Sequence, residues 1–116
     1  MAVEPIAVTR GGVYVPEWGN ADREDADKIR VHYRFLSFEE QQQLLRPEDV
    51  GKNFGYEARV LAAMVHKLEN LEIDDGKKRK IDTGEKLVAE PGLDGLALEL
   101  WIEFRNKSAI DKKKLE

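Results

Sequence analysis

Imidazole side chains are the first groups to consider for chemistry, and the 116-residue sequence contains two of them, His32 and His66. They are far apart in the chain, and no His-x-x-x-His spacing places two imidazoles on one helix face. Cysteine is absent, which excludes thiolate metal ligands, cysteine nucleophiles and disulfides. We therefore expect no bound metal, with His32 on the polar face of a strand and His66 on the surface of a helix.

The acid-rich segment "ENLEIDDG" invites comparison with a calcium-binding loop. An EF-hand loop needs glycine at its sixth position and glutamate at its twelfth. Counted from Asn70, Gly76 comes one position late, and the twelfth residue is Ile81. The segments "RGG" and "DDGK" also lack the glycine spacing that cradles a phosphate group. Neither calcium nor a nucleotide phosphate is therefore expected.

Paired carboxylates could in principle act as general acid and base. Adjacent acids on a loop, such as Asp74 and Asp75, are usually solvated, whereas catalysis needs a desolvated site with convergent groups. No pattern in the sequence marks such a site. The two serines, Ser37 and Ser108, both stand at helix-capping positions. We expect neither an enzymatic activity nor a cofactor.

Two basic features raise the question of nucleic-acid binding. Basic residues alternate along "KIRVHYRF", at Lys28, Arg30, His32 and Arg34, and "KKRK" occupies residues 77–80. Such features could follow a phosphate backbone. The formal net charge of −4 opposes this interpretation, and the aromatic residues beside the stripe point to the opposite strand face. We interpret both features as solvated surface.

The N-terminal part of the chain predicts a β-hairpin over about residues 12–36. "GGVYVPEW" is a β-branched and aromatic run that meets Pro16, a residue tolerated at a strand end or edge. "GNADREDADK" is polar and predicts an exposed loop. In "KIRVHYRF", apolar residues such as Ile29 and Val31 alternate with basic ones, which predicts a half-buried strand.

The remainder, about residues 37–107, predicts a small bundle of about four helices. In "SFEE" the Ser37 side chain can cap a helix while Glu40 returns a hydrogen bond to the Ser37 amide, which is a capping box. The helix that follows should run to about Arg46, because Pro47 cannot continue it. The segment after this proline predicts a turn.

Two further helices are expected in the middle of the chain. Apolar residues at helical spacing predict a central core helix from about Phe54 to Leu71. The segment "IDDGKKRK" then predicts an exposed loop around Gly76. Asp82 with Glu85 three residues later repeats the capping-box spacing and predicts a helix of about two turns.

The last predicted helix, from Leu93 to about Phe104, is apolar around much of its circumference. Besides the main stripe, Trp101 and Ile102 widen its apolar side. Such a helix is either well buried or covers a partner. The cap spacing recurs at Ser108, close to the end of the sequence.

Together these elements predict an α+β fold for one domain over residues 1–116, with the N-terminal β-hairpin packed on the helices and a short C-terminal tail. The composition, 41% hydrophobic and 36% charged, is that of an ordinary globular protein. No apolar run approaches the roughly 20 residues that a membrane-spanning helix needs. The N-terminus lacks a secretory signal pattern, so we expect a cytoplasmic protein.

The order of the segments resembles that of a known family, the tail assembly chaperones of long-tailed bacteriophages and prophages. The resemblance lies in "VYVPEW", "IRVHYRFLSFEEQ", "VHKLENLEIDDGKKRKIDTGEKLVAEPGLDGLALELWIEF" and "NKSAIDKKK". It runs from about Val13 to Lys114 and consists of the order of the segments, their spacing and short shared sequence motifs. It implies a non-enzymatic protein that binds the tape-measure protein in the host cytoplasm and assists assembly of tail tube subunits around it.

The resemblance also directs attention to residues that could contact such a partner. Helix-in-groove and strand-addition contacts use apolar and aromatic groups. The sequence offers these at Trp101 and Phe104 on the last helix, and at Val13, Tyr14 and Trp18 near the first strand. The same residues could instead fill the core. Trp18, between a proline and a charged loop, is the aromatic residue least needed inside.

Other interpretations stay open at this point. A small structural virion or tail-completion protein would remain in the particle, and a nucleic-acid-binding module would use the basic strand. Many members of the resembled family also have a longer, frameshifted product. Lys112–Lys114 is what a run of adenines encodes, so the resemblance allows a slip site there.

Overall fold

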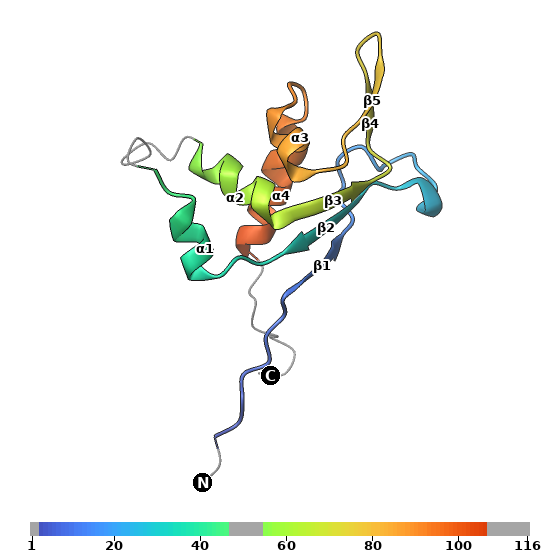
Figure 1. Cartoon of the computed structure of the whole chain (residues 1–116). Helices are drawn as coiled ribbons and strands as arrows, with labels where there is room; N and C mark the ends of the chain where they lie inside the picture. The colour runs from blue at the N-terminus through green and yellow to red at the C-terminus, as the bar shows by residue number, and fades with distance from the viewer. Residues whose placement is uncertain (1–2, 47–54, 107–116) are drawn as a thin grey trace.

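The fold combines a β-sheet with helices packed against one of its faces (Figure 1). The computed structural model describes residues 3–46 and 55–106. These residues form four α-helices, a three-stranded sheet and a separate two-stranded sheet. The predicted α+β class, with an N-terminal hairpin and about four helices, is confirmed. Within the same ranges, none of the helices combines the length and apolar character that crossing a bilayer requires.

The predicted N-terminal hairpin is present. Strand β1, Gly11–Tyr14, pairs antiparallel with strand β2, Arg30–Arg34. Along β2 the apolar residues Val31 and Tyr33 are buried, while the basic residues lie on the outer face. A Cβ atom on Gly11 would overlap the Tyr33 carbonyl oxygen. The close approach of the two strands therefore requires glycine at the start of β1.

A buried amide organises the loop between β1 and β2. The Asn20 side chain donates hydrogen bonds to the carbonyl oxygens of Pro16, at 2.7 Å, and Ile29, at 3.2 Å, and accepts one from the Ile29 amide at 2.8 Å. A short 3-10 helix, Asp25–Asp27, follows in the same loop. The sequence predicted only an exposed loop here, but Asn20 gives it a fixed internal partner.

Helix α1, Phe38–Gln43, begins with the predicted capping box. The Ser37 hydroxyl accepts a hydrogen bond from the Glu40 amide at 3.0 Å, and the Glu40 carboxylate accepts one from the Ser37 amide at 3.1 Å. The helix ends earlier than the predicted Arg46. The predicted turn at Pro47–Asn53 lies outside the described residues.

The predicted helix over residues 54–71 is wrong in its second half. Helix α2 covers Tyr56–Met64, and the chain then passes directly into strand β3, Val65–Glu69. Strand β3 pairs antiparallel with β2, with Leu68 opposite Val31, so the sheet order is β1-β2-β3. The apolar spacing satisfies a helix and a strand alike up to this point, and pairing with a distant strand decides between them.

The predicted loop at residues 73–80 is mostly a second hairpin. Strands β4, Glu72–Asp74, and β5, Lys78–Lys80, pair antiparallel around a turn in which Gly76 has φ 103°. At both ends of this hairpin an acid on β4 faces a lysine on β5. Opposite charges across an antiparallel pair stabilise it modestly.

The last two helices were predicted with nearly correct bounds. Helix α3, Gly84–Ala89, is capped by Thr83, whose hydroxyl accepts a hydrogen bond from the Lys86 amide at 3.2 Å. The predicted cap, Asp82, instead forms an ion pair with the Lys86 ammonium at 2.9 Å. Helix α4, Asp94–Asn106, matches the strongly apolar segment. Ser108 and the lysine run at 112–114 lie outside the described residues.

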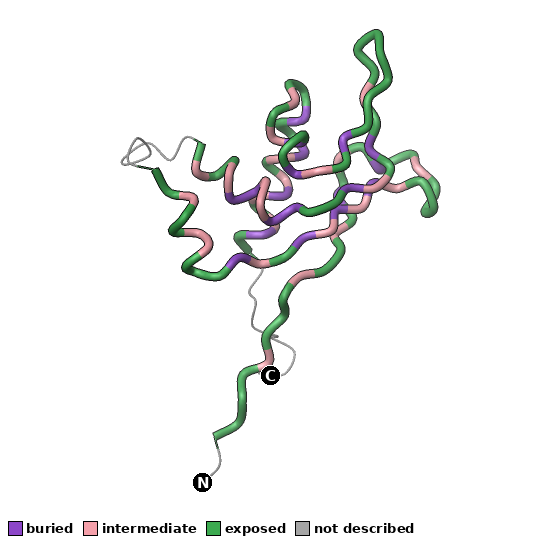
Figure 2. The backbone as a smooth tube through the Cα atoms, in the orientation of Figure 1, coloured by how far each residue is buried: buried purple, intermediate pink, exposed green. Residues whose placement is uncertain are grey.

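The core lies between the inner face of the sheet and helices α2, α3 and α4 (Figure 2). On α4 its members are Leu96, Leu100 and Phe104, which share one face because they are spaced four residues apart. The other core residues are Ile29, Val31, Tyr33, Leu36, Val60, Leu61, Met64, Val65, Leu68, Leu71, Ile81, Leu87 and Leu93. One inner stripe thus anchors α4, Ala97 and Trp101 pack partly against the core, and Leu98 and Ile102 stay exposed. The extent of the domain over residues 1–116 stays a prediction.

Candidate functional site

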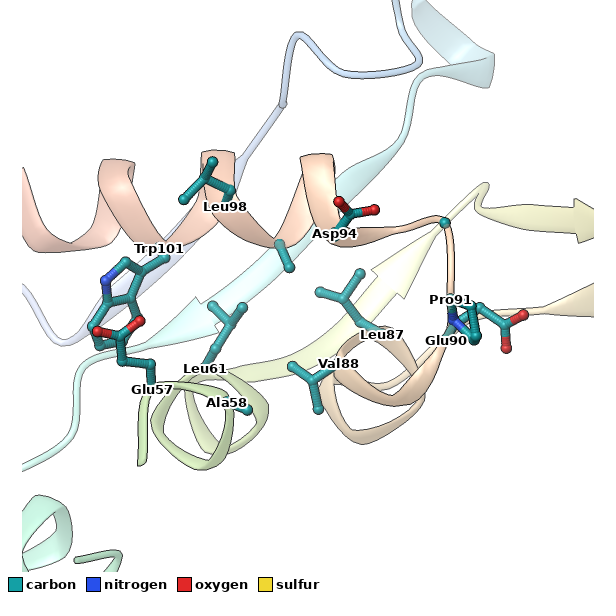
Figure 3. Close-up of a pocket in the computed structure, with 12 residues that line it drawn as sticks. Glu57, Ala58, Leu61, Leu87, Val88, Glu90, Pro91, Asp94, Leu98 and Trp101 are labelled. Atoms are coloured by element: carbon teal, nitrogen blue, oxygen red, sulfur yellow. The ribbon is translucent and has the colours of Figure 1, made fainter. Parts of the chain in front are cut away.

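An open groove of about 560 Å³ lies between α2, α3 and α4 (Figure 3). Leu61 of α2 and Leu87 of α3 are buried at its base, while Leu98 and Trp101 of α4 form one wall. Its apolar lining consists of Ala58, Leu61, Leu87, Val88, Pro91, Gly92, Ala97, Leu98 and Trp101. The groove is therefore a concave apolar surface formed by three helices.

Helix α4 carries exposed apolar residues on the side that its core stripe does not use. Leu98 is 59% exposed and Ile102 is 50% exposed, whereas Leu96 and Leu100 are 0% exposed. Leu98 lines the groove, and Ile102 lies one turn further along the helix. Full burial of a leucine or isoleucine side chain is worth about 1.5–3 kcal/mol. These two residues, one turn apart on the same helix, extend the apolar surface of the groove along α4.

The ionisable residues that line the groove are all acidic: Glu57, Glu90 and Asp94. Glu90 is neutralised by an ion pair with Arg79, at 2.7 Å. Among the described residues, Glu57 and Asp94 have neither an ion pair nor a side-chain hydrogen bond. Glu57 lies beside Trp101 at one end of the groove and Asp94 at the other end (Figure 3). The groove thus offers two carboxylates without an ion-pair partner, each in the first turn of its helix, where the helix dipole favours negative charge.

Trp101 is the candidate partner residue that the structure places in the groove. Its ring is half-buried, and the Arg105 guanidinium lies over it at 5.5 Å from the ring centroid. Phe104, by contrast, is 5% exposed and packs 4.6 Å from Tyr33 and 6.2 Å from Tyr14, measured between ring centroids. We therefore correct the sequence-based hypothesis: Phe104 is a core residue and is not presented to a partner.

Tyr14 and Trp18 join the N-terminal hairpin to α4 through Glu99. The Tyr14 hydroxyl and the Glu17 amide donate hydrogen bonds to one Glu99 carboxylate oxygen, both at 2.8 Å, and the Trp18 amide donates to the other at 3.0 Å. Burial, followed by the hydrogen bond to Glu99, raises the pKa of Tyr14 well above its usual value. The Trp18 ring packs on Gly95, where a Cβ atom would lie 3.1 Å from its indole nitrogen. In this structure both aromatic residues have a structural role.

Val13, the remaining candidate, lies on the outer face of the sheet and not in the groove. It is 51% exposed and stands opposite His32. The structure also corrects the placement of His66, which lies on β3 with its ring 6.0 Å from that of His32. His32 contacts the Glu69 carboxylate at 2.7 Å. Within residues 3–46 and 55–106, no three His, Cys, Asp or Glu side chains are grouped so that they could hold a metal ion.

The basic stripe on β2 is paired with acids along its length. His32 contacts Glu69, as described above, and Arg34 forms an ion pair with Glu40 at 2.9 Å. Arg30 lies 3.7 Å from the Asp25 carboxylate. The hydrogen bond from Arg34, followed by that from the Ser37 amide, lowers the pKa of Glu40 to about 2. Three of the four residues of the stripe, Arg30, His32 and Arg34, therefore have an acidic partner in the structure.

The second basic cluster, residues 77–80, is compensated in part, through Arg79. Arg79 contacts both Asp75, at 2.8 Å, and Glu90, at 2.7 Å. On the same hairpin, lysines of β5 face acids of β4. These ion pairs reduce the positive charge that either basic feature could offer to phosphate groups.

Sequence reasoning identified one wall of the groove but not the groove itself. The wide apolar side of the last helix was the available signal, and it pointed to Trp101. Leu98 sits at the same helical face as Ile102, four residues away, which is a pattern that the sequence contains. Glu57 and Asp94 carry no signal in the sequence, because only the packing of α2 against α4 brings them to the same groove.

Comparison with known proteins gives no match, whether to a protein family, to a curated protein or to a solved structure. The groove, its exposed apolar residues and its charges are therefore the features that bear on function.

Proposed function

We propose that this protein is a non-enzymatic tail assembly chaperone of a long-tailed phage or prophage, which binds the tape-measure protein in the host cytoplasm. The proposal combines the resemblance of segment order with one structural observation. This observation is the apolar groove between α2, α3 and α4, continued along α4 by Leu98 and Ile102. A chaperone needs an open apolar surface that its own fold does not consume, and the groove is such a surface.

The groove suits an extended helical partner. A tape-measure protein is long, helical and apolar, so it needs cover until tube subunits surround it. An amphipathic helix can place its apolar face into a groove formed by other helices. Trp101 and Leu98 would then lose their contact with water, and the partner would lose an equal apolar face. Such a contact is small enough to be released when tail tube subunits arrive.

A nucleic-acid-binding function has less support than the chaperone function. The basic residues of β2, and Arg79 of the β4–β5 hairpin, have acidic partners, as the ion pairs above describe. A tail-completion protein that stays in the virion would also use an apolar surface. It differs from a chaperone in one observable respect, since it would be found in purified particles.

The test is co-expression of this protein with the tape-measure protein encoded in the same genome. Wild-type protein is expected to keep the tape-measure protein soluble and to co-purify with it. The double variant Leu98→Ala with Trp101→Ala is expected to lose most of this effect. Phe38→Ala is the matched control, because it removes exposed apolar surface on α1, outside the lining of the groove. An insoluble and unbound tape-measure protein beside folded wild-type protein would contradict the proposal.

A further inference from the structure

We infer that the groove binds one kind of occupant, an amphipathic helix of a protein partner whose apolar stripe is flanked by lysine or arginine. This deepens the proposed function and rests on it only for the identity of the partner, which would be a tape-measure segment of this composition. The chemistry of the occupant follows from the length, lining and charge of the groove.

The length of the groove fits two turns of a bound helix. Its lining on α4 runs from Asp94 to Trp101, which at a rise of 1.5 Å per residue is about 10 Å. A helix of the partner covers the same length between positions i and i+7. Three apolar anchors, at i, i+3 or i+4, and i+7, would therefore meet the apolar base and walls. Leu61, Leu87 and Leu98 are placed to receive them.

The charge of the groove selects the flanks of that helix. Glu57 and Asp94, each in the first turn of a helix, have no ion-pair partner among the described residues, and Glu90 is occupied by Arg79. Two cations described lie next to the lining without belonging to it: Arg79 is bound to Glu90, and Arg105 lies over the Trp101 ring at 5.5 Å from its centroid. A cationic side chain beside each end of the bound stripe would find an acid without displacing an existing ion pair. An anionic flank would meet like charge at both ends.

The same charges argue against a second copy of this chain as the occupant. A twofold contact between two grooves would place the same surface on both sides. Glu57 and Asp94 of each copy would then lie in a shared apolar interface, and the groove lining contains no lysine or arginine that could pair with them. The whole chain also carries a net charge of −4. A basic partner satisfies these acids, whereas a second copy adds to them.

The experiment uses full-length protein and three synthetic helical peptides with an identical leucine stripe. Their flanking residues are lysine, glutamine or glutamate, and binding is measured by isothermal titration calorimetry at low and at high salt. The lysine peptide is expected to bind tightest and the glutamate peptide weakest, with a ratio of about tenfold at low salt. The ratio should shrink at high salt, because exposed charges are screened.

Matched variants locate the effect. The double variant Glu57→Gln with Asp94→Asn is expected to weaken the lysine peptide by about three- to tenfold and to leave the glutamine peptide nearly unchanged. Asp22→Asn with Glu24→Gln removes the same two charges from the β1–β2 loop and should change neither. Trp101→Ala should weaken all three peptides by at least about tenfold, as truncation of a central aromatic anchor does.

Equal binding of the three peptides, or no binding by any of them, would overturn the inference. It would also be overturned if Leu98→Asp converted a dimer into a monomer in sedimentation, because the groove would then hold a second copy. The proposed function fails separately. If the tape-measure protein does not bind but the lysine peptide does, the proposed function is rejected and the inference about the groove stands. If the tape-measure protein binds the groove variants as tightly as wild type, the inference about the groove is rejected and the proposed function stands.

Discussion

The outer face of the sheet and the groove on the helical side are both open surfaces rich in charged residues, but their charges are arranged differently. On the sheet, Arg34 is paired with Glu40, and His32 contacts Glu69. In the groove, Glu57 and Asp94 lack such partners among the described residues, and they stand at the ends of an apolar surface. Basic residues of β2 on the sheet face therefore have acids beside them, whereas the two groove acids have no ion-pair partner.

This difference teaches that charge in a sequence and charge on a surface are separate properties. The alternating basic residues of β2 are conspicuous along the chain, yet folding brings an acid to three of them. The acids of the groove are inconspicuous in an acidic chain, yet folding isolates them beside apolar side chains. Protein interfaces typically have an apolar core and a polar rim, and the groove, unlike the sheet face, has this arrangement.

The largest expected effect separates the two apolar sides of α4. Leu100→Ala should destabilise the protein by about 3 kcal/mol, because it leaves a cavity in the core. Leu98→Ala should change stability by no more than about 0.5 kcal/mol, since its side chain lies mainly in water. Urea denaturation measures both. Similar losses for the two variants would mean that the groove wall is part of the core and not a free surface.

The next effect concerns the packing that forms the groove. A Cβ atom on Gly84 would lie 2.6 Å from the carbonyl oxygens of Ala62 and Val65. Gly84→Ala should therefore push α3 away from α2 and cost on the order of 2 kcal/mol. Gly95→Ala is the control, because its nearest neighbour is the Trp18 side chain, which can shift more easily than backbone. Denaturation midpoints that fall equally for both would contradict this account of how α2 and α3 approach.

A smaller effect is expected where the hairpin joins α4. Tyr14→Phe removes one hydrogen bond to Glu99 and should cost about 1 kcal/mol at neutral pH. Because the pKa of Tyr14 is raised in the folded protein, its contribution is complete below the unfolded value of about 10 and is lost as the pH rises above it. Wild type should consequently lose stability more steeply than Tyr14→Phe above that pH. Parallel pH profiles from thermal unfolding would refute the role assigned to this contact.

The ion pair between Arg34 and Glu40 on the sheet face should make the stability of the protein depend on pH in the acid range. The pKa of Glu40 is lowered to about 2 by Arg34 and Ser37, so its stabilising contribution is present above the unfolded value and is lost as the pH falls toward about 2. Glu40→Gln should show a weaker dependence on pH over this interval than wild type. Added salt should reduce the difference, since the pair is exposed. Unfolding curves recorded across this interval measure it, and identical pH dependence in both proteins would count against the ion pair.

The smallest expected effect is an absence of binding. If the basic residues of the sheet face are balanced by their neighbours, the protein should not retain a fluorescent DNA duplex at low salt in an anisotropy titration. Lys67, an exposed residue of β3 opposite His32 on the sheet face, should be dispensable, so Lys67→Gln should leave that result unchanged. Salt-dependent DNA binding that weakens in this variant would reverse the comparison between the two surfaces and favour a nucleic-acid-binding function.

Much of the local structure could be predicted from the sequence, because it depends on neighbours along the chain. The capping box of Ser37 and Glu40 needs residues three positions apart, and the half-buried strand β2 needs only alternation. The inner stripe of α4 likewise repeats at helical spacing. These features were predicted correctly because the residues that determine them lie close together in the sequence.

The rest could not be predicted, because it depends on contacts between distant segments. Val65 and Leu68 fit the continuation of a helix as well as a strand, and β2 decides the outcome by pairing with them. The β4–β5 hairpin did have a local signal, the Asp-Gly pair at 75–76 between complementary charges. The groove had none, since Glu57 reaches Trp101 only when α2 packs against α4.

The most direct test of the central claim uses the indole N–H signals of the two tryptophans in a two-dimensional ¹⁵N NMR spectrum. Trp101 lines the groove and Trp18 packs on Gly95, so the two signals report on different places. On titration with the lysine-flanked helical peptide, the Trp101 indole signal is predicted to shift or broaden, while the Trp18 signal and the amide signals of β2 stay in place. A shift of the β2 amides with an unchanged Trp101 signal would contradict the account, because binding would then take place on the sheet face.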